Sequence, residues 1–130
     1  MGPDYFFHHT IPELKNYTQM LFLFLDFDGT LVPTRDDPAK CFLSSEIKSC
    51  LTSIASSEKA RMAILSGRTI GDIAKRALFK GIYYGGNHGL EISGPDLTYV
   101  HPQAREGRRA INGVSRTIEA EIAAINGVFI

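Results

Sequence analysis

An unbroken apolar run that ends in two closely spaced acids is the feature that most constrains the fold of this chain. The run Met20–Leu25 is followed at once by Asp26 and, one residue later, by Asp28. A short continuous apolar run predicts a strand buried on both faces, as in a parallel sheet covered by helices. Charge beside a core is costly unless something compensates it. The acids therefore either lie in a solvated loop or share a chemical task.

Apolar segments further along the chain alternate between strand and helix patterns. They predict strands over 62–65, 82–84, 90–93 and 97–100, and helices over 43–54, 70–78 and 111–125. Ser44 or Ser45 is the expected N-cap of the first helix, Thr69 that of the second, and Gly81 marks the second helix's end. The order β-α-β-α-β favours an α/β fold, a Rossmann-like parallel sheet flanked by helices. Ligands bind such sheets at the carboxyl ends of the strands, where Asp26 and Ser66 lie.

Bulk properties narrow the class of partner. The 130 residues suit one domain, and the equal totals of 14 basic and 14 acidic residues give no indication of nucleic-acid binding or of an anionic membrane surface. The longest apolar run is far shorter than the ~20 residues that a membrane-spanning helix needs. Cys41 and Cys50 are too few for a disulfide framework, so a reducing cytoplasm is expected, with Cys50 as a small buried side chain in a helix.

The two acids suit phosphoryl chemistry. Neighbouring carboxylates repel unless a cation intervenes, and Mg²⁺ accepts one or two protein oxygens together with substrate phosphate. One carboxylate could attack phosphorus, while the other acid protonates the leaving oxygen and later deprotonates water. Gly29 lets the backbone pass close to a phosphate, to which its amide could donate.

The run Asp26-Phe27-Asp28-Gly29-Thr30-Leu31 resembles the first motif of the haloacid dehalogenase superfamily of phosphotransferases. The resemblance implies that Asp26 is the nucleophile and Asp28 the general acid/base. It also implies a Mg²⁺ held by the Asp26 carboxylate, the main-chain carbonyl of Asp28 and a later acid. Ser66 resembles the second motif, which hydrogen-bonds the phosphoryl group, although a serine here also suits a turn. The expected phosphate-binding residues are Gly29, Thr30, Ser66, Gly67 and Arg68, and Arg68 has the alternative of being a solvated side chain.

Two later segments narrow the resemblance to trehalose-6-phosphate phosphatases. Leu-Ser-Gly-Arg at 65–68 and Gly-Asn-His-Gly-Leu-Glu at 86–91 are similar to that family, and the likeness extends over 21–130. Sucrose-phosphate and mannosyl-phosphoglycerate phosphatases share the first two motifs but usually differ at the second segment. The resemblance implies that Asn87, His88 and Glu91 face the sugar. Each of the three could instead serve the glycine-rich turn itself.

The expected organisation is an N-terminal extension over 1–19, a partial core over 20–127 and the start of a cap domain over 128–130. The family's cap residues, third-motif lysine and fourth-motif acids have no place in this sequence, so we expect an incomplete fold, a truncated chain and little activity alone. The expected function is hydrolysis of trehalose 6-phosphate, a small-molecule sugar phosphate, by an enzyme of a family whose members are often monomers. Another sugar-phosphate phosphatase, or an inactive remnant that binds a partner, remains the alternative.

Overall fold

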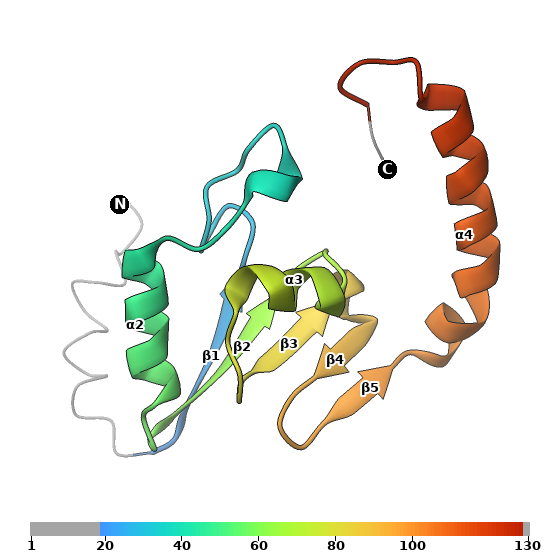
Figure 1. Ribbon diagram of the computed structural model, residues 1–130. Helices are drawn as coiled ribbons and strands as arrows, with labels where there is room; N and C mark the ends of the chain where they lie inside the picture. Colours follow the sequence, from blue (N-terminus) through green and yellow to red (C-terminus); the bar gives the residue numbers. More distant parts are fainter. Residues whose placement is uncertain (1–18, 129–130) are drawn as a thin grey trace, which may run out of the picture.

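The computed structural model describes residues 19–128 and contains a single mixed sheet of five strands in the order β1-β2-β3-β4-β5 (Figure 1). β1 (Leu21–Asp26), β2 (Ala60–Leu65) and β3 (Tyr83–Gly86) are parallel. β4 (Glu91–Ser93) and β5 (Thr98–Val100) continue the sheet as an antiparallel hairpin. The expected parallel arrangement of the first two strands is confirmed, and the segments expected as strands over 90–93 and 97–100 are strands with slightly shorter bounds. Residues 1–18 of the expected extension over 1–19, and residues 129 and 130 of the expected cap start over 128–130, lie outside the described part.

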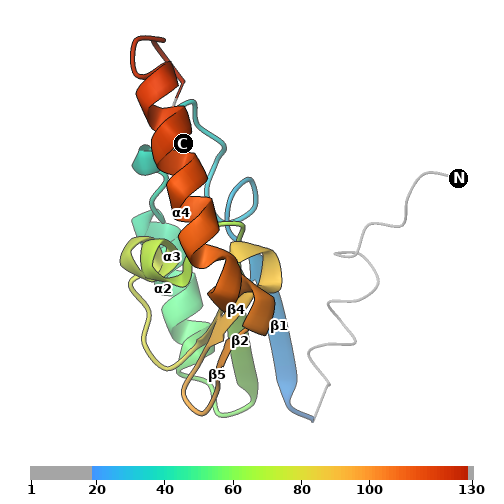
Figure 2. The same cartoon turned by 90° about the vertical axis from the view of Figure 1, so that its right-hand side faces the viewer.

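Two helices connect the parallel strands and cover one face of the sheet. α2 (Ser45–Ala55) and α3 (Ile70–Ala77) both lie on the same side, as the edge-on view in Figure 2 shows. The core forms between these helices and the sheet, where Phe27, Ile64 and Ile73 are fully buried. Burial of such side chains removes about 1.5–3 kcal/mol of apolar hydration cost each. The α/β class expected from the sequence is therefore correct.

The opposite face of the sheet is exposed at β1, so the expectation that this first strand is buried on both faces was wrong. In β1 the odd-numbered residues from Leu21 are half-buried, whereas Phe22 and Phe24 are exposed on the other face. They line a shallow apolar hollow of about 510 Å³ with Leu65 and Tyr83. The continuous apolar run predicted cover on both faces, but within the described residues only one face is covered.

The predicted N-cap residues of α2 and α3 agree with the structure, whereas the predicted end of α3 does not. Ser44 Oγ accepts from the Ile47 amide at 3.3 Å, and Thr69 Oγ1 accepts from the Asp72 amide at 3.2 Å, so both helices begin as expected. The second helix ends before Gly81, because Leu78 itself adopts the left-handed cap conformation at φ 61°. Cys50 is exposed on α2, which corrects its expected burial.

The last helix leaves the sheet. α4 (Pro102–Ile122) begins nine residues before the expected start at 111, and its two internal glycines do not break it. Figures 1 and 2 show it rising past the carboxyl edge of the strands, and none of its residues is buried. The first turn of a helix tolerates proline, which explains why Pro102 opens it. Among the described residues, no helix combines the length and apolarity required to cross a bilayer.

Candidate functional site at the carboxyl edge of the sheet

The parallel strands bring the two sequence motifs to one edge of the sheet. Asp26 is paired with Leu65 in register, so the residues that follow each strand lie side by side. The Ser66 amide donates to Gly85 O at 2.9 Å, and the Asn87 amide donates to Arg68 O at 2.8 Å. These bonds fix the ends of three strands relative to one another. The motifs that the sequence placed 40 residues apart thus form one site.

Asp26 ends β1, and the turn behind it is closed by main-chain bonds. The Leu31 and Val32 amides both donate to Phe27 O, and Gly29 has φ 88°, a conformation that glycine adopts at little cost. Thr30 Oγ1 donates to Asp26 Oδ2 at 3.0 Å, which leaves the other carboxylate oxygen available for a reacting group. The Gly29 amide donates to Val32 O at 2.8 Å, so the structure already uses the donor that we expected at a phosphate.

Asp28 is engaged by a bidentate arginine. Arg68 Nε donates to Asp28 Oδ2 at 2.8 Å and Arg68 Nη2 donates to Asp28 Oδ1 at 2.7 Å. Ser66 Oγ adds a longer bond of 3.4 Å to the same carboxylate. The hydrogen bonds from Arg68 hold the pKa of Asp28 below its ordinary value, against the opposing effect of partial burial. Asp28 is therefore a carboxylate at neutral pH in this arrangement.

Arg68 is held in turn from a second side. Its Nη1 donates to Asp72 Oδ2 at 2.9 Å, and Arg76 Nε donates to the same oxygen at 2.9 Å. Arg76 Nη1 continues to Ala39 O at 2.8 Å, in the short helix η1 (Pro38–Lys40). The hydrogen bond from Arg76, followed by that from Arg68, lowers the pKa of Asp72. A network of alternating charges thus ties the loop after β1 to α3.

The two acids border different hollows that meet at Gly67. Asp26 lines a hollow of about 330 Å³ together with Ser66, Gly67 and His88. Asp28 lines another of about 400 Å³ together with Arg68 and, again, Gly67. Ser66 is 9% exposed and sits between the acids, accepting from the Arg68 amide at 3.1 Å while it faces Asp28. The site therefore has an Asp26 side and an Asp28 side.

His88 closes the Asp26 side. It follows β3 in the short helix η2 (Asn87–Gly89), where three successive residues have positive φ, namely 49° for Asn87, 55° for His88 and 89° for Gly89. Non-glycine residues rarely adopt this conformation, and such strain clusters at functional sites. The imidazole lies directly over Gly67, where a Cβ atom would come within 2.6 Å of His88 Cε1. Gly67 is thus needed for the approach of this ring.

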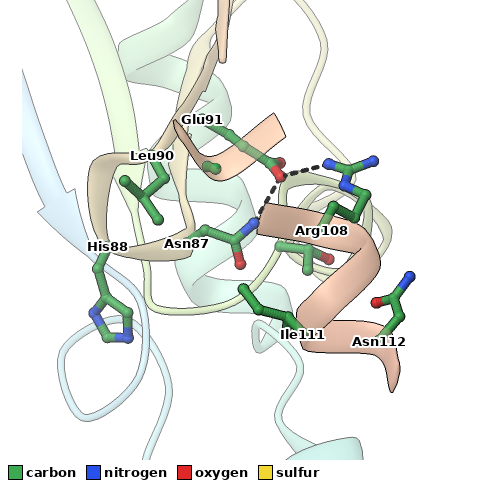
Figure 3. Close-up of a pocket in the computed structure, with 9 residues that line it drawn as sticks. Asn87, His88, Leu90, Glu91, Arg108, Ile111 and Asn112 are labelled. Carbon is green, nitrogen blue, oxygen red and sulfur yellow. Dashed lines mark hydrogen bonds and ion pairs between the residues drawn. The ribbon is translucent and has the colours of Figure 1, made fainter. Parts of the chain in front are cut away.

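A larger hollow of about 700 Å³ opens on the other side of His88, between η2 and α4 (Figure 3). Glu91 Oε1 accepts from Asn87 Nδ2 at 2.6 Å and from Arg108 Nη2 at 3.4 Å. Ile111 and Asn112 of α4 complete its wall. Asn87, His88 and Glu91, which were expected to face the sugar, all line this hollow. Arg108 precedes the helix expected over 111–125, and it reaches this wall because α4 begins at Pro102.

The described residues offer hard oxygen donors for a metal, although few of them. No group of three or more His, Cys, Asp or Glu side chains between 19 and 128 is arranged to hold an ion. Asp26 has a free carboxylate oxygen, whereas both oxygens of Asp28 are bonded to Arg68. Only the main-chain carbonyl of Asp28 could then join Asp26. One carboxylate with one carbonyl fits Mg²⁺, which usually keeps several water ligands.

Comparison with known proteins places this site in a family. A family model described as trehalose-phosphatase matches residues 24–130. Trehalose-phosphate phosphatase B of Arabidopsis thaliana is 35% identical over 88 residues, which are 68% of this chain and 23% of that protein. A trehalose-phosphate phosphatase of Mycolicibacterium paratuberculosis is 35% identical over 111 residues, covering 83% of this chain and 27% of that protein. The chain thus spans about a quarter of the length of either relative.

A solved structure gives the same fold. A trehalose-6-phosphate phosphatase related protein superposes with a TM-score of 0.74 at 19% identity, covering 84% of this chain and 46% of the other. At that identity the likeness concerns the fold alone. It agrees with a sheet flanked by helices.

Proposed function

We propose that this chain, which belongs to the trehalose-phosphatase family, carries the phosphoryl-transfer residues of an enzyme that hydrolyses trehalose 6-phosphate to trehalose and phosphate. The observation that supports this most directly is the convergence of Asp26, Ser66 and His88 on one hollow beside a second acid, Asp28. A carboxylate with a free oxygen at the end of a rigid strand is suited to in-line attack on phosphorus.

In the first step an oxygen of Asp26 attacks phosphorus, and the bond from phosphorus to the sugar oxygen breaks. Asp28, as the carboxylic acid, gives its proton to the departing oxygen, so the sugar leaves as the neutral alcohol. Arg68 lowers the pKa of Asp28 in the free site, whereas the negative charge of an approaching phosphate acts in the opposite direction. Substrate binding thus favours the protonated form that this step needs.

In the second step Asp28 is the base. Its carboxylate takes a proton from water, the water oxygen attacks phosphorus, and the bond from phosphorus to Asp26 breaks. Phosphate leaves, and both acids return to their starting states. Ser66 lies 3.4 Å from Asp28 and lines the hollow of Asp26, which suits a hydroxyl that donates to the phosphoryl oxygens.

A bound Mg²⁺, held by the Asp26 carboxylate and the Asp28 carbonyl, would neutralise charge on the transferring group. Thr30 supports this arrangement, because its bond to Oδ2 orients the Asp26 carboxylate. Gly29 and Gly67 provide the close backbone approach on either side of the phosphate. The proposed sugar contacts are Asn87, His88 and Glu91, in the adjoining hollow that already contains a hydrogen-bonded amide and carboxylate.

The proposal includes a cytoplasmic site of action. Cys41 and Cys50 are both free thiols, which suits a reducing compartment.

Small sugar phosphates would reach the carboxyl edge of the sheet past the larger hollow, which opens beside α4.

The test is phosphate release from trehalose 6-phosphate, sucrose 6-phosphate and glucose 6-phosphate by the longest natural polypeptide that contains this sequence. We expect activity that needs Mg²⁺, stops with a chelator and prefers trehalose 6-phosphate. Asp26→Asn should lower turnover by more than about 10³-fold, because it removes the nucleophile. Asp36→Asn, an exposed acid in the following loop, is the matched control. Equal rates on all three sugars would contradict the substrate, and an active Asp26→Asn protein would contradict the mechanism.

A further inference from the structure

We infer that Arg68 is a positioning residue for Asp28 rather than a ligand of the substrate phosphate. The inference rests on the proposed function, because it concerns the acid/base group of that reaction. It differs from the expectation that the motif Ser66-Gly67-Arg68 as a whole binds phosphate. The distances, the donor count and the burial of the arginine side chain each support it.

The donors of Arg68 are almost fully used within the protein. A guanidinium has five N–H donors. Two of them bind the Asp28 carboxylate, one binds Asp72 Oδ2, and one binds Pro38 O at 3.0 Å. One donor remains, so Arg68 cannot bind a phosphate through two hydrogen bonds at once unless it releases Asp28, Asp72 or the Pro38 carbonyl.

The surroundings of Arg68 oppose such a release. Its side chain is only 13% exposed, and the guanidinium carbon lies 5.9 Å from the centre of the Phe27 ring, which is itself fully buried. Asp72 is held from its other side by Arg76, which is anchored to the carbonyl of Ala39. Arg68 is thus fixed by α3, by η1 and by the aromatic ring between the two acids.

Asp28 has the opposite character. Its side chain is 40% exposed, and Arg68 and Ser66 are the side chains that hold it among the described residues. A short acid at a glycine-containing turn can rotate about its side-chain bonds at little cost. The fixed arginine therefore determines where the carboxylate lies, and it holds that carboxylate beside Ser66, at the boundary of the hollow that contains Asp26.

A positioning role and a phosphate-binding role predict different dependence on the leaving group. Proton delivery matters for a sugar alcohol, which is a poor leaving group, and little for p-nitrophenolate, which leaves without help. The leaving group departs in the first step, which kcat/KM reports, whereas kcat also contains the second step, in which Asp28 is the base for both substrates. With Arg68→Met we therefore expect kcat/KM for trehalose 6-phosphate to fall by about 10- to 100-fold and kcat/KM for p-nitrophenyl phosphate by less than about threefold. Inhibition by inorganic phosphate should stay within about twofold of wild type.

Equal losses of kcat/KM on both substrates, with weaker inhibition by inorganic phosphate, would show that Arg68 binds the phosphate and would overturn the inference. An unchanged or faster enzyme would overturn it as well. Lys75→Met, an exposed cation on the same helix as Asp72, is the matched control. Arg68→Lys and Asp72→Asn keep most of the network and serve if Arg68→Met does not fold. Each should shift the same substrate ratio in the same direction by a smaller factor.

A measurement without turnover keeps this inference separate from the proposed function. Crystal structures of the wild-type protein and of Arg68→Met should differ in the orientation of the Asp28 carboxylate, while Asp26 and Ser66 keep theirs. An Asp28 carboxylate in the same position in both structures would overturn the inference even in a protein without phosphatase activity. A reoriented Asp28 in a protein that hydrolyses neither substrate would support the positioning role and refute the proposed reaction.

Discussion

The hollow around Asp26 and the larger hollow beside α4 adjoin at His88, and they are built in different ways. The first is enclosed by strand ends that share main-chain hydrogen bonds, such as those from Ser66 to Gly85 and from Asn87 to Arg68. The second depends on α4. Its N-cap residue, His101, donates its amide to Leu90 O at 2.8 Å, and Arg108 of α4 pairs with Glu91 of β4 at 3.4 Å.

In the proposed function this difference corresponds to two tasks. Phosphoryl transfer needs reacting groups held within a fraction of an ångström, and a sheet edge provides that rigidity. Recognition of a sugar tolerates adjustment, because hydroxyl groups can be met by side chains on a more loosely attached helix. Three predictions test how far the two regions differ. They run from the largest expected effect to the smallest.

The tightly packed region should not accept even one methyl group at Gly86. A Cβ atom there would lie 2.8 Å from the Ile70 amide nitrogen and 2.9 Å from Arg68 O, and neither main-chain atom can move freely. We expect Gly86→Ala to lower the free energy of unfolding by about 1–3 kcal/mol, as overpacking does elsewhere. Urea denaturation followed by circular dichroism gives this quantity.

Gly113 is the matched position in the looser region. It lies inside α4, and a Cβ atom there would meet nothing within 4 Å. Gly113→Ala should leave stability unchanged or raise it by about 0.5–1 kcal/mol, because alanine favours helix more than glycine. If Gly86→Ala and Gly113→Ala lowered the free energy of unfolding equally, the contrast between the two regions would be wrong.

The second prediction concerns substrate affinity at the α4 wall. Arg108 is 64% exposed in its side chain and shares Glu91 with Asn87, so its donors can turn to a sugar hydroxyl. Arg108→Met should raise KM for trehalose 6-phosphate about three- to tenfold, the value of one hydrogen bond, with kcat unchanged. KM for p-nitrophenyl phosphate, which has no sugar, should not move.

Arg109→Met provides the control for that substitution. Arg109 is an exposed neighbour on α4 that does not line the hollow, so its loss removes the same charge from the same helix. A rise in KM with Arg109→Met as large as that with Arg108→Met would indicate a general electrostatic effect instead of a sugar contact.

The smallest expected effect is a pH dependence of stability that arises in the network beside Asp28. The bond from Arg76 lowers the pKa of Asp72 below its reference value of 3.8. A carboxyl with a depressed pKa in the folded state adds stability above the unfolded value and loses it as pH falls through the folded value. Thermal stability should therefore decline below about pH 4.

Asp72→Asn isolates this contribution. The variant should be slightly less stable at neutral pH, and its melting temperature should fall less steeply in acid. Because the Asp72 side chain is 36% exposed, solvent screens the pair and the change should be modest. An identical acid profile in both proteins would show that other carboxyl groups cause the decline.

Local sequence signals were sufficient for much of the fold. The caps at Ser44 and Thr69 depend on one side chain and a nearby amide, so a short window contains the information. The placement of Ser66 beside Asp28 followed from the geometry of parallel strands. Helix 111–125 was predicted too short at its start, because Gly107 and Gly113 lower helix propensity but do not forbid a helix.

The remaining features depend on contacts between distant residues. The pairing of Arg68 with Asp28 spans 40 residues, and nothing near Arg68 in the sequence distinguishes it from a solvated arginine. Arg108 reaches Glu91 only through the direction in which α4 leaves the hairpin. The exposure of Phe24 depends on which segments cover the sheet, and the apolar run that contains it carries no information about them.

The order of the strands also bears on how the protein folds as it is synthesised. Because β1 to β5 lie side by side in chain order, each strand pairs with the one made just before it, and none must insert between two others. A chain that emerges from the ribosome with its N-terminus first can therefore extend this sheet one strand at a time. The slowest closure is that of β1 with β2, which spans the longest loop between paired strands. The edge that holds Asp26 and Ser66 can thus form before α4 has been translated.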